Sequence, residues 1–268
     1  MKHEQLQILS RADVGAACAR LDRLCGRGRK TSTWRADDAR FSDEPEGTVR
    51  TVAALFVATD GAYFGLEGVD PWDVRRDARL YAGPHPVVAH PPCERWGRYW
   101  SGGPSAKVKR KLGDDDGCFL SAVASVRAWG GVLEHPEGSH AFRKFELGEP
   151  TWRKGWEPSP YGGWVCCVAQ GNYGHRARKL TWLYAVMGPS NAVTPGDLDF
   201  SIPAPRSRLD YGYHSAEERR ERHGEVSPRV NLSRLTTREN LATPAPFRDM
   251  LLDLARRARP SAQARKSG

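Results

Sequence analysis

The chain has 268 residues, with 41 Lys and Arg against 32 Asp and Glu, so its formal net charge is +9 at pH 7. Because many of the basic residues are clustered, this excess favours a polyanionic partner, nucleic acid before a membrane surface. No apolar run reaches the roughly 18 residues of a membrane span. Residues 1–5 are too polar to begin a signal peptide, so we expect a cytoplasmic protein.

Residues 1–49 are predicted to form an extension rather than part of the core. Apolar side chains recur at helical spacing over residues 11–26, which predicts a short amphipathic helix. Residues 27–49 are charged and poor in apolar side chains, as is typical of a linker or a DNA-contacting arm. We therefore expect a small helical arm before the folded core.

Residues 50–188 are predicted to form an α/β core. A helix is expected over residues 118–129, because three aspartates precede it and Gly130-Gly131 ends it. Strands that alternate with helices favour a mostly parallel sheet with helices on both faces. The apolar runs that indicate buried strands are 52–57, 87–89, 132–133, 164–168 and 182–186.

The remaining chain divides into a loop-rich segment and a C-terminal helix. Residues 189–230 are rich in Pro, Gly, Ser and charge, which indicates loops. Within residues 231–268, apolar side chains at helical spacing predict an amphipathic helix over 247–259 that returns to the core, followed by a basic tail.

Cys93 is the most informative single residue. It follows the apolar run 86–89 across a Pro-Pro turn, so it lies where a buried strand ends. Ligands of open α/β sheets bind at the carboxyl ends of strands, which makes this cysteine a candidate nucleophile. His90, Arg95 and Arg98 are near enough in sequence to lower the pKa of its thiol. The alternative is a small buried residue at a turn, the commoner place for a cysteine.

Several segments, taken in order over about residues 51–255, resemble the motifs of the DNA cytosine carbon-5 methyltransferases. The chain is similar to a compact branch of that family, of the kind found in phage and prophage genomes. The resemblance implies a Rossmann-like methyltransferase fold. The matching segments are 55–67 (cofactor-side motif), 91–93 (nucleophile motif), 133–136 (Glu-Asn-Val segment), 173–178 (arginine motif), and 234–239 with 242–244 (closing pair of motifs).

The resemblance implies covalent catalysis on cytosine in double-stranded DNA. A thiolate that adds to carbon 6 makes an enamine, and carbon 5 of this enamine attacks an electrophilic methyl group. Cys93 is then the nucleophile, and Glu134 hydrogen-bonds or protonates the ring nitrogen and the exocyclic amine. Arg176 or Arg178 holds the base carbonyl and a nearby phosphate. The target base has to be flipped out of the duplex to reach such a pocket.

The same resemblance implies the cofactor and the partner. S-adenosylmethionine is the expected methyl donor, double-stranded DNA is the expected partner, and residues 189–230 are the expected target-recognition segment. The histidines and cysteines show no metal-ligand spacing, so no metal is expected. The residues expected to bind the cofactor are Phe56, Asp60, Gly61, Gly65, Asp70, Asp73 and Thr243. Those expected to bind DNA are Arg95, Arg98, Lys107, Lys109, Lys111, Gln170 and Lys179.

Departures from the family pattern keep two related functions open. Ala54, Ala58 and Asp60 stand where an acid and two glycines are expected, and His135 stands where the family has Asn. An enzyme of the same fold with a different one-carbon donor is therefore an alternative. So is a catalytically inactive, basic DNA-binding protein that keeps the fold.

Two further classes of enzyme are less well supported. The Pro-Pro turn is also similar to the Pro-Pro-aromatic motif of amino-methylating enzymes, although Cys93 stands where those enzymes have an aromatic residue. A cysteine hydrolase would pair Cys93 with His135 or His175, but no family signature supports that pairing.

Overall fold

The computed structural model describes residues 49–97, 99–102, 107–108, 110–188, 195–196, 198, 239 and 241–258. The helix and arm expected over residues 1–49 lie outside them, except for Val49. So does the loop-rich segment 189–230, except for residues 195–196 and 198. No helix within the described parts of the chain is long and apolar enough to cross a membrane.

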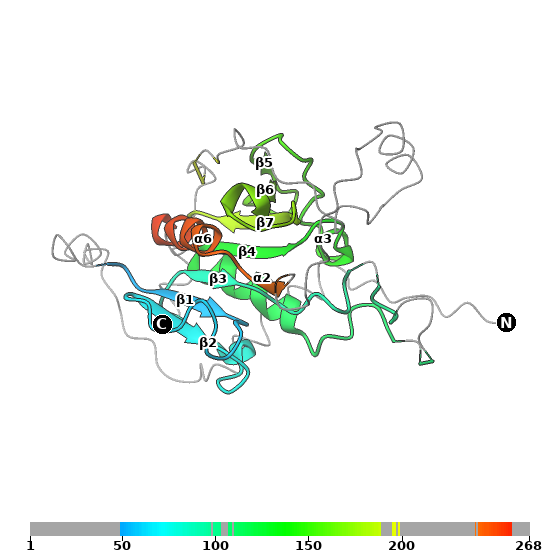
Figure 1. Ribbon diagram of the computed structural model, residues 1–268, viewed down its shortest axis with the longest axis horizontal. Coiled ribbons are helices and arrows are strands. Elements are labelled where there is room, and N and C mark those ends of the chain that lie inside the picture. Colours follow the sequence, from blue (N-terminus) through cyan, green and yellow to red (C-terminus); the bar gives the residue numbers. More distant parts are fainter. Residues whose placement is uncertain are drawn as a thin grey trace, which may run out of the picture.

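A seven-stranded sheet, in the order β2-β1-β3-β4-β7-β6-β5, forms the centre of the protein (Figure 1). The pairs β1–β2, β1–β3 and β3–β4 are parallel, whereas β4–β7, β6–β7 and β5–β6 are antiparallel. The strands are β1 (Val52–Leu55), β2 (Val69–Trp72), β3 (Val87–Ala89), β4 (Gly131–Pro136), β5 (Glu157–Pro158), β6 (Trp164–Ala169) and β7 (Leu180–Val186).

The sheet is therefore mixed, and parallel at one end only, rather than mostly parallel as expected. The reason lies in the connection between β6 and β7, which is the short 3-10 helix η2 (Gln170–Tyr173) and a turn. A short connection can only join antiparallel neighbours, since a parallel pair needs a crossover of a dozen or more residues. The α/β architecture itself is confirmed.

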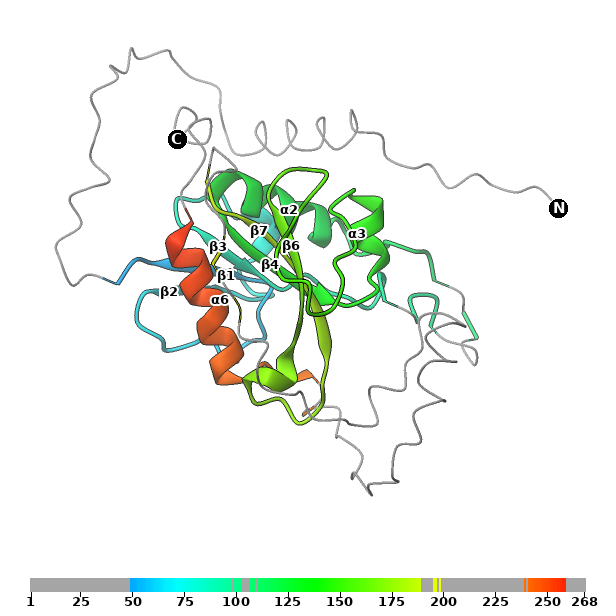
Figure 2. The same cartoon turned by 90° about the horizontal axis from the view of Figure 1, so that it is seen from above.

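Helices cover both faces of the sheet, as predicted, so the strands between them are apolar on both sides. The helix α2 (Cys118–Trp129), which has the predicted bounds, packs on the face that carries Leu55 and Leu133. The helix α6 (Ala245–Arg257) packs on the opposite face, against Ala54 and Val132 (Figures 1 and 2). It begins two residues before the predicted start, and it has Pro246 in its first turn, where proline is tolerated because the backbone N–H there has no partner within the helix.

Three elements were not predicted from the sequence. The strand β2 contains Asp70 and Pro71, which hide a strand pattern; proline is tolerated there because β2 lies at the edge of the sheet. The strand β5, at the other edge, has only two residues. The short helix α3 (His140–Lys144) begins where Ser139 accepts a hydrogen bond from the backbone N–H of Ala141 at 3.1 Å.

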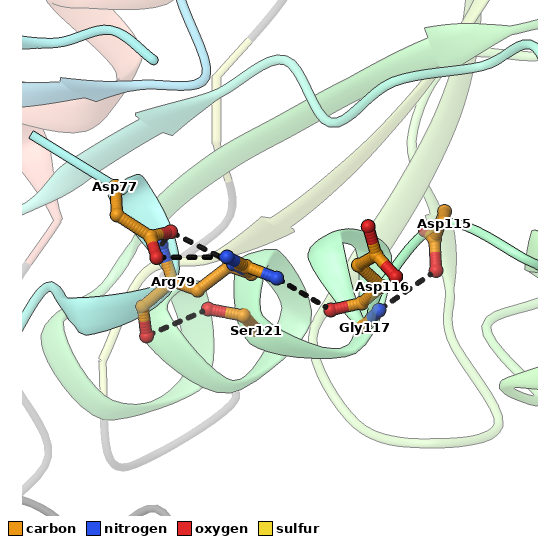
Figure 3. A network of polar contacts seen from close by, with 6 residues as sticks. All are labelled: Asp77, Arg79, Asp115, Asp116, Gly117 and Ser121. Carbon is orange, nitrogen blue, oxygen red and sulfur yellow. Dashed lines mark hydrogen bonds and ion pairs between the residues drawn. The ribbon is translucent and has the colours of Figure 1, made fainter. Parts of the chain in front are cut away.

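A polar network fastens the start of α2 to the 3-10 helix η1 (Ala78–Leu80), as Figure 3 shows. The guanidinium of Arg79 pairs with the Asp77 carboxylate at 2.8 Å and donates to the carbonyl of Asp116 at 3.2 Å. In the next turn, the hydroxyl of Ser121 donates to the carbonyl of Arg79 at 3.4 Å. These contacts orient α2 against the connection between β2 and β3.

Trp96 anchors the segment that follows Cys93. Its ring is 2% exposed and packs against Phe119 and Phe145. Its indole N–H donates to the Asp115 carboxylate at 2.7 Å, and the same carboxylate accepts the backbone N–H of Phe119 at 2.9 Å. The carbonyl of Cys93 accepts the backbone N–H of Trp96 at 3.0 Å. The turn after the cysteine is thus tied to the first residues of α2.

Trp96→Ala should lower the free energy of unfolding by about 3–5 kcal/mol, the usual cost of removing a large aromatic side chain from a packed core. Tyr99→Ala is the matched control, because Tyr99 is 63% exposed and an exposed substitution changes stability by about 0.5 kcal/mol or less. Urea unfolding of both variants measures the difference. Equal losses in the two variants would show that Trp96 is not an anchor.

Candidate active site

The carboxyl ends of β1, β3 and β4 lie side by side. The parallel register aligns Leu55 with Ala89, and Ala89 with Leu133. The residues that follow these three in the sequence, Phe56, His90 and Glu134, therefore emerge at the same edge of the sheet. Strands β2 and β3 lie on opposite sides of β1, so the order of the strands reverses at β1. Open α/β sheets bind their ligands at such a reversal of strand order.

A chain of hydrogen bonds links polar side chains at this edge. The hydroxyl of Tyr63 lies 2.7 Å from Nε2 of His90, and Nδ1 of His90 lies 2.9 Å from Oε2 of Glu134. On the other side, Nε2 of Gln170 donates to Oε1 of Glu134 at 3.2 Å. The side chains of His90 and Glu134 are each 14% exposed, so they are shielded from solvent yet reachable.

Strand alternation explains why these side chains meet. Side chains two residues apart in a strand share a face of the sheet. Val88 and Val132 belong to the cluster under α6. His90 follows Val88 by two residues, and Glu134 follows Val132 by two residues. Tyr63, from the connection between β1 and β2, packs in the same cluster. The polar chain therefore lies on the α6 side of the sheet.

Hydrogen-bond directions identify Oε1 of Glu134 as an acceptor. The hydroxyl of Thr181 donates to the carbonyl of Lys179 at 3.2 Å, so it accepts from Nε2 of Gln170, which lies 3.0 Å away. This contact turns the Gln170 NH₂ group, rather than its oxygen, toward the carboxyl of Glu134. An oxygen that accepts in this way is the state expected of a carboxylate.

The pKa of Glu134 agrees with that assignment. Burial by itself would raise the pKa of this carboxyl, but the hydrogen bond from His90, the charge of His90 and the ammonium of Lys179 outweigh it. The pKa of Glu134 is therefore lowered from its ordinary value, and the group is a carboxylate at neutral pH.

Cys93 is half-buried, and its thiol is a weaker acid than the sequence suggested. Burial, followed by the negative charge of Glu134, raises the pKa of the thiol, while Lys179 opposes the shift. The expectation of a lowered pKa is wrong because burial and the charge of Glu134 outweigh the nearby cations. Of the three expected cations, His90 points to Glu134 and Arg95 lies 3.9 Å from the Glu94 carboxylate, while Arg98 is outside the described residues.

Lys179 is the cation for which the structure shows an interaction with both Cys93 and Glu134. Burial lowers the pKa of its ammonium, and the two acidic groups oppose that shift. Its Nζ donates to the carbonyl of Ala242 at 3.1 Å, just before α6. This residue was predicted to bind DNA, whereas its place in the fold is at the candidate active site.

The two expected arginines lie on the turn that leads to β7. Arg176 is exposed and forms an ion pair with Glu239. The carbonyl of Arg178 accepts the backbone N–H of Gly171 at 3.1 Å, which fixes the turn after η2. Their expected contact with the target base remains a prediction.

His135 faces the opposite side of the sheet from Glu134. It is 1% exposed and its ring meets the ring of Phe119 edge-on, with centroids 5.1 Å apart. Burial lowers the pKa of His135 to about 4, against an opposing effect of the Glu134 charge. His135 is therefore a neutral core residue. This role, and the contacts of the His175 ring with the backbone of Ala177 and Glu239, weaken the cysteine-hydrolase alternative.

The residues expected to bind a cofactor lie around the ends of β1 and β2. Phe56, the first residue after β1, has a left-handed conformation with φ of 59°. Asp60 has φ of 53°, in the left-handed region that aspartate tolerates better than most residues, at a position where the family pattern has Gly. A Cβ on Gly61 would lie 2.8 Å from the carbonyl oxygen of Ala58, so that turn requires glycine. Gly65 is exposed and has φ of 72°.

Of the two candidate acids, Asp73 occupies the position that suits a ligand at a strand end. It follows β2 directly, is 4% exposed, and accepts from the Thr59 hydroxyl at 2.8 Å. That hydrogen bond is the main reason why the pKa of Asp73 is lowered. Asp70 lies within β2, where Arg76 and the indole of Trp72 engage its carboxylate. Thr243 is half-buried just before α6.

The expected DNA contacts fall into two groups. Lys107 and Lys111 are exposed in the segment that follows Cys93, and Lys109 is outside the described residues. Gln170, by contrast, is 2% exposed and holds Glu134, so its predicted place on a DNA-binding surface is wrong. The apolar strand β6, which ends at Ala169 just before Gln170, gave no signal for this buried role.

Sequence reasoning also missed Tyr63 and Thr181, and it gave His90 only the role of a nearby cation. The available signal was the position of His90, a polar side chain at the end of a buried strand and two residues after Val88.

Comparison with known proteins finds no family model, no curated protein and no solved structure that matches this chain. Within the described residues, no group of three or more His, Cys, Asp or Glu side chains could hold a metal ion. The geometry of the site therefore carries the functional argument.

Alkylation of Cys93 should accelerate steadily as the pH rises through 8 to 9, because only the thiolate reacts and its pKa is raised. Glu134→Gln should speed alkylation at pH 8, since it removes a negative charge beside the sulfur. Lys179→Met should slow it. Iodoacetamide labelling followed by peptide mass spectrometry resolves Cys93 from the other cysteines. If both variants were alkylated at the rate of the wild-type protein, neither charge would act on Cys93.

His135 should make stability depend on pH between about 6.5 and about 4. The unfolded chain binds a proton near 6.5 and the folded chain only near 4, so stability falls as the pH is lowered through this window. The loss amounts to roughly 3 kcal/mol. His135→Leu should flatten the curve of unfolding free energy against pH there. Parallel curves for the two proteins would contradict a neutral, buried His135.

Proposed function

We propose that this protein is a DNA base-modifying enzyme that acts on carbon 5 of cytosine through a covalent adduct between Cys93 and carbon 6. The observation that carries the proposal is the placement of Cys93 after β3 and of an ionised, shielded Glu134 within the adjacent parallel strand β4, where the charge of Glu134 acts on the thiol. A nucleophile and a carboxylate are the two groups that this addition needs. The order of the family-like motifs along the chain supports the same chemistry.

The architecture is compatible with a Rossmann-like methyltransferase. Four parallel strands lie at one end of the sheet, helices cover both faces, and Phe56, Gly61 and Asp73 surround the strand ends where such a fold binds its cofactor. A carboxylate such as that of Asp73 has spare acceptor sites for the hydroxyls of a ribose. When bound, S-adenosylmethionine supplies an electrophilic methyl group. A different one-carbon donor is the alternative.

The chain's own residues divide the work of the reaction. Cys93 forms the bond to carbon 6. Glu134 accepts from the exocyclic amino group through an acceptor site that His90 and Gln170 leave open, and it passes a proton to the ring nitrogen as the thiol adds. Lys179 stabilises the thiolate by its charge. Arg176 or Arg178 is proposed to hold the base carbonyl. The apolar surroundings of the site strengthen each of these electrostatic contacts.

The segment after Cys93 suits a duplex from which one base has been flipped. It combines basic side chains with exposed apolar ones: Tyr99 is 63% exposed and Val108 is 74% exposed, beside exposed Lys107 and Lys111. Basic groups neutralise phosphates, and an aromatic or apolar side chain can fill the gap that a flipped base leaves in the stack. This surface supports double-stranded DNA as the partner.

A catalytically inactive DNA-binding protein is the second candidate, and the raised pKa of the Cys93 thiol favours it. Both candidates predict DNA binding with a steep salt dependence. They differ in whether a covalent bond to DNA ever forms.

A duplex that contains 5-fluorocytosine should trap a stable adduct with the protein in the presence of S-adenosylmethionine, because fluorine blocks the loss of the group at carbon 5. Denaturing gel electrophoresis and mass spectrometry should place the adduct on Cys93, and Cys93→Ser should form none. Nucleosides from cells that express the protein should contain a modified deoxycytidine. Tight DNA binding with neither adduct nor modified base would favour the inactive protein.

A further inference from the structure

We propose that Tyr63, His90 and Glu134 form a proton relay, in which His90 is a positioning residue that stores one proton and exchanges it with the pyrimidine ring through Glu134. The inference deepens the proposed function and rests on it. It is carried by two contacts at the edge of the sheet, of 2.7 Å between Tyr63 Oη and His90 Nε2 and of 2.9 Å between His90 Nδ1 and Glu134 Oε2.

The donor on each atom follows from the surrounding network. The pKa of Glu134 is lowered, so the group is a carboxylate, and its Oε2 faces His90; Nδ1 of His90 therefore carries the hydrogen of this contact. The neutral ring then leaves Nε2 as an acceptor for the Tyr63 hydroxyl. When Nε2 is protonated, the same hydroxyl accepts instead, after a rotation about its C–O bond. His90 can therefore gain or lose a proton without breaking either hydrogen bond.

Burial keeps Tyr63 in this role. Its side chain is 3% exposed, and burial, followed by the charge of Glu134, raises the pKa of its hydroxyl. Tyr63 therefore remains protonated and serves as a hydrogen-bond partner, not as a base. Because it lies in the segment 55–67 that resembles the cofactor-side motif, the relay also joins that segment to the base-contacting carboxylate.

The relay balances the protons of the addition step. Sγ of Cys93 forms its bond to carbon 6 as the S–H bond breaks. The electron pair of the carbon 5–carbon 6 bond moves toward carbon 4, and the ring nitrogen next to carbon 4 gains an electron pair and a proton. The Glu134–His90 pair takes up one proton and delivers one, so none has to come from solvent. After the methyl group has been transferred, a water molecule takes the proton of carbon 5, the double bond between carbon 5 and carbon 6 forms again, and the carbon 6–sulfur bond breaks. The ring nitrogen gives its proton back to the Glu134–His90 pair, which restores the thiol of Cys93.

The charges that face the relay come from several elements. Lys179, before β7, and Cys93, after β3, interact with Glu134, and His135 is its neighbour on β4. Arg248 and Asp249 of α6 act on Tyr63 from the other side. Any pH dependence assigned to His90 must therefore be separated from these groups by substitution of His90 itself.

Nitrogen NMR of histidine-labelled protein tests the resting arrangement without any substrate. His90 should show the Nδ1–H tautomer, because Nδ1 faces the Glu134 carboxylate at 2.9 Å. Glu134→Ala should give a mixture of the two tautomers, because it removes the acceptor that holds the hydrogen on Nδ1. An Nε2–H tautomer in the wild-type protein, or a tautomer that Glu134→Ala leaves unchanged, would overturn the relay.

Kinetics test the role in the reaction. His90→Gln should slow adduct formation with the 5-fluorocytosine duplex by about a hundredfold, the usual range for a lost acid–base group, and should change the shape of the pH profile. Tyr63→Phe should alter the same profile with a smaller loss of rate. His85→Gln is the matched control, because His85 lies before β3 and His90 after it. DNA affinity and thermal unfolding check that the variants are folded.

The outcomes separate the two proposals. An adduct in the wild-type protein together with an unchanged rate and pH profile in His90→Gln would reject the relay and leave the proposed function standing. Failure of the wild-type protein to form an adduct would reject both, and an Nδ1–H tautomer in the NMR spectra would then define the Tyr63–His90–Glu134 chain as a structural feature.

Discussion

The negative charge of Glu134 is the constraint on which the rest of the site depends. A carboxylate that is only 14% exposed has lost much of its hydration, and such a charge is stable only when donors and opposite charges replace the water. His90 and Gln170 supply the donors, and Lys179 supplies positive charge. These three residues come from the ends of β3, β6 and the turn before β7. The charge is thus held only if all the strands around it pair in register.

The same charge contributes to the weak acidity of the Cys93 thiol. Burial is the larger reason why the pKa of this thiol is raised, and the negative charge of Glu134 adds to it. In the proposed function, a proton shared between the pyrimidine and Glu134 would weaken that second effect, so the thiol would ionise more easily when a base fills the site. A thiol that stays protonated until then is also protected from oxidation and alkylation, which act on thiolates. The raised pKa of Cys93 and a role in catalysis are therefore compatible.

Apolar runs and punctuating glycines were enough to predict most of the core from the sequence, including β1, β3, α2, β6 and β7. The same reasoning placed Cys93 after β3, whereas Glu134, expected just after a brief strand, lies within β4. Contacts between distant segments could not be predicted, because Tyr63 lies in a connection without periodicity and meets His90 only through tertiary packing. Lys179 and Gln170 were assigned to a DNA surface by their residue type, whereas the turn after β6 directs them inward. The antiparallel part of the sheet follows from the short connection between β6 and β7, because a connection of this length joins antiparallel neighbours.

Strand β4 shows how alternation separates two kinds of titratable group. Glu134 lies on the α6 side with its donors, and His135 lies on the α2 side against Phe119. A shift of β4 by one residue would exchange their faces. It would bury the carboxylate among the rings around Phe119, away from His90, and leave a histidine beside Cys93. Six paired positions between β4 and β7, from Gly131 with Val186 to Pro136 with Thr181, oppose such a shift. The antiparallel strand that breaks the parallel pattern of the sheet is therefore also the element that fixes the acid opposite its partners.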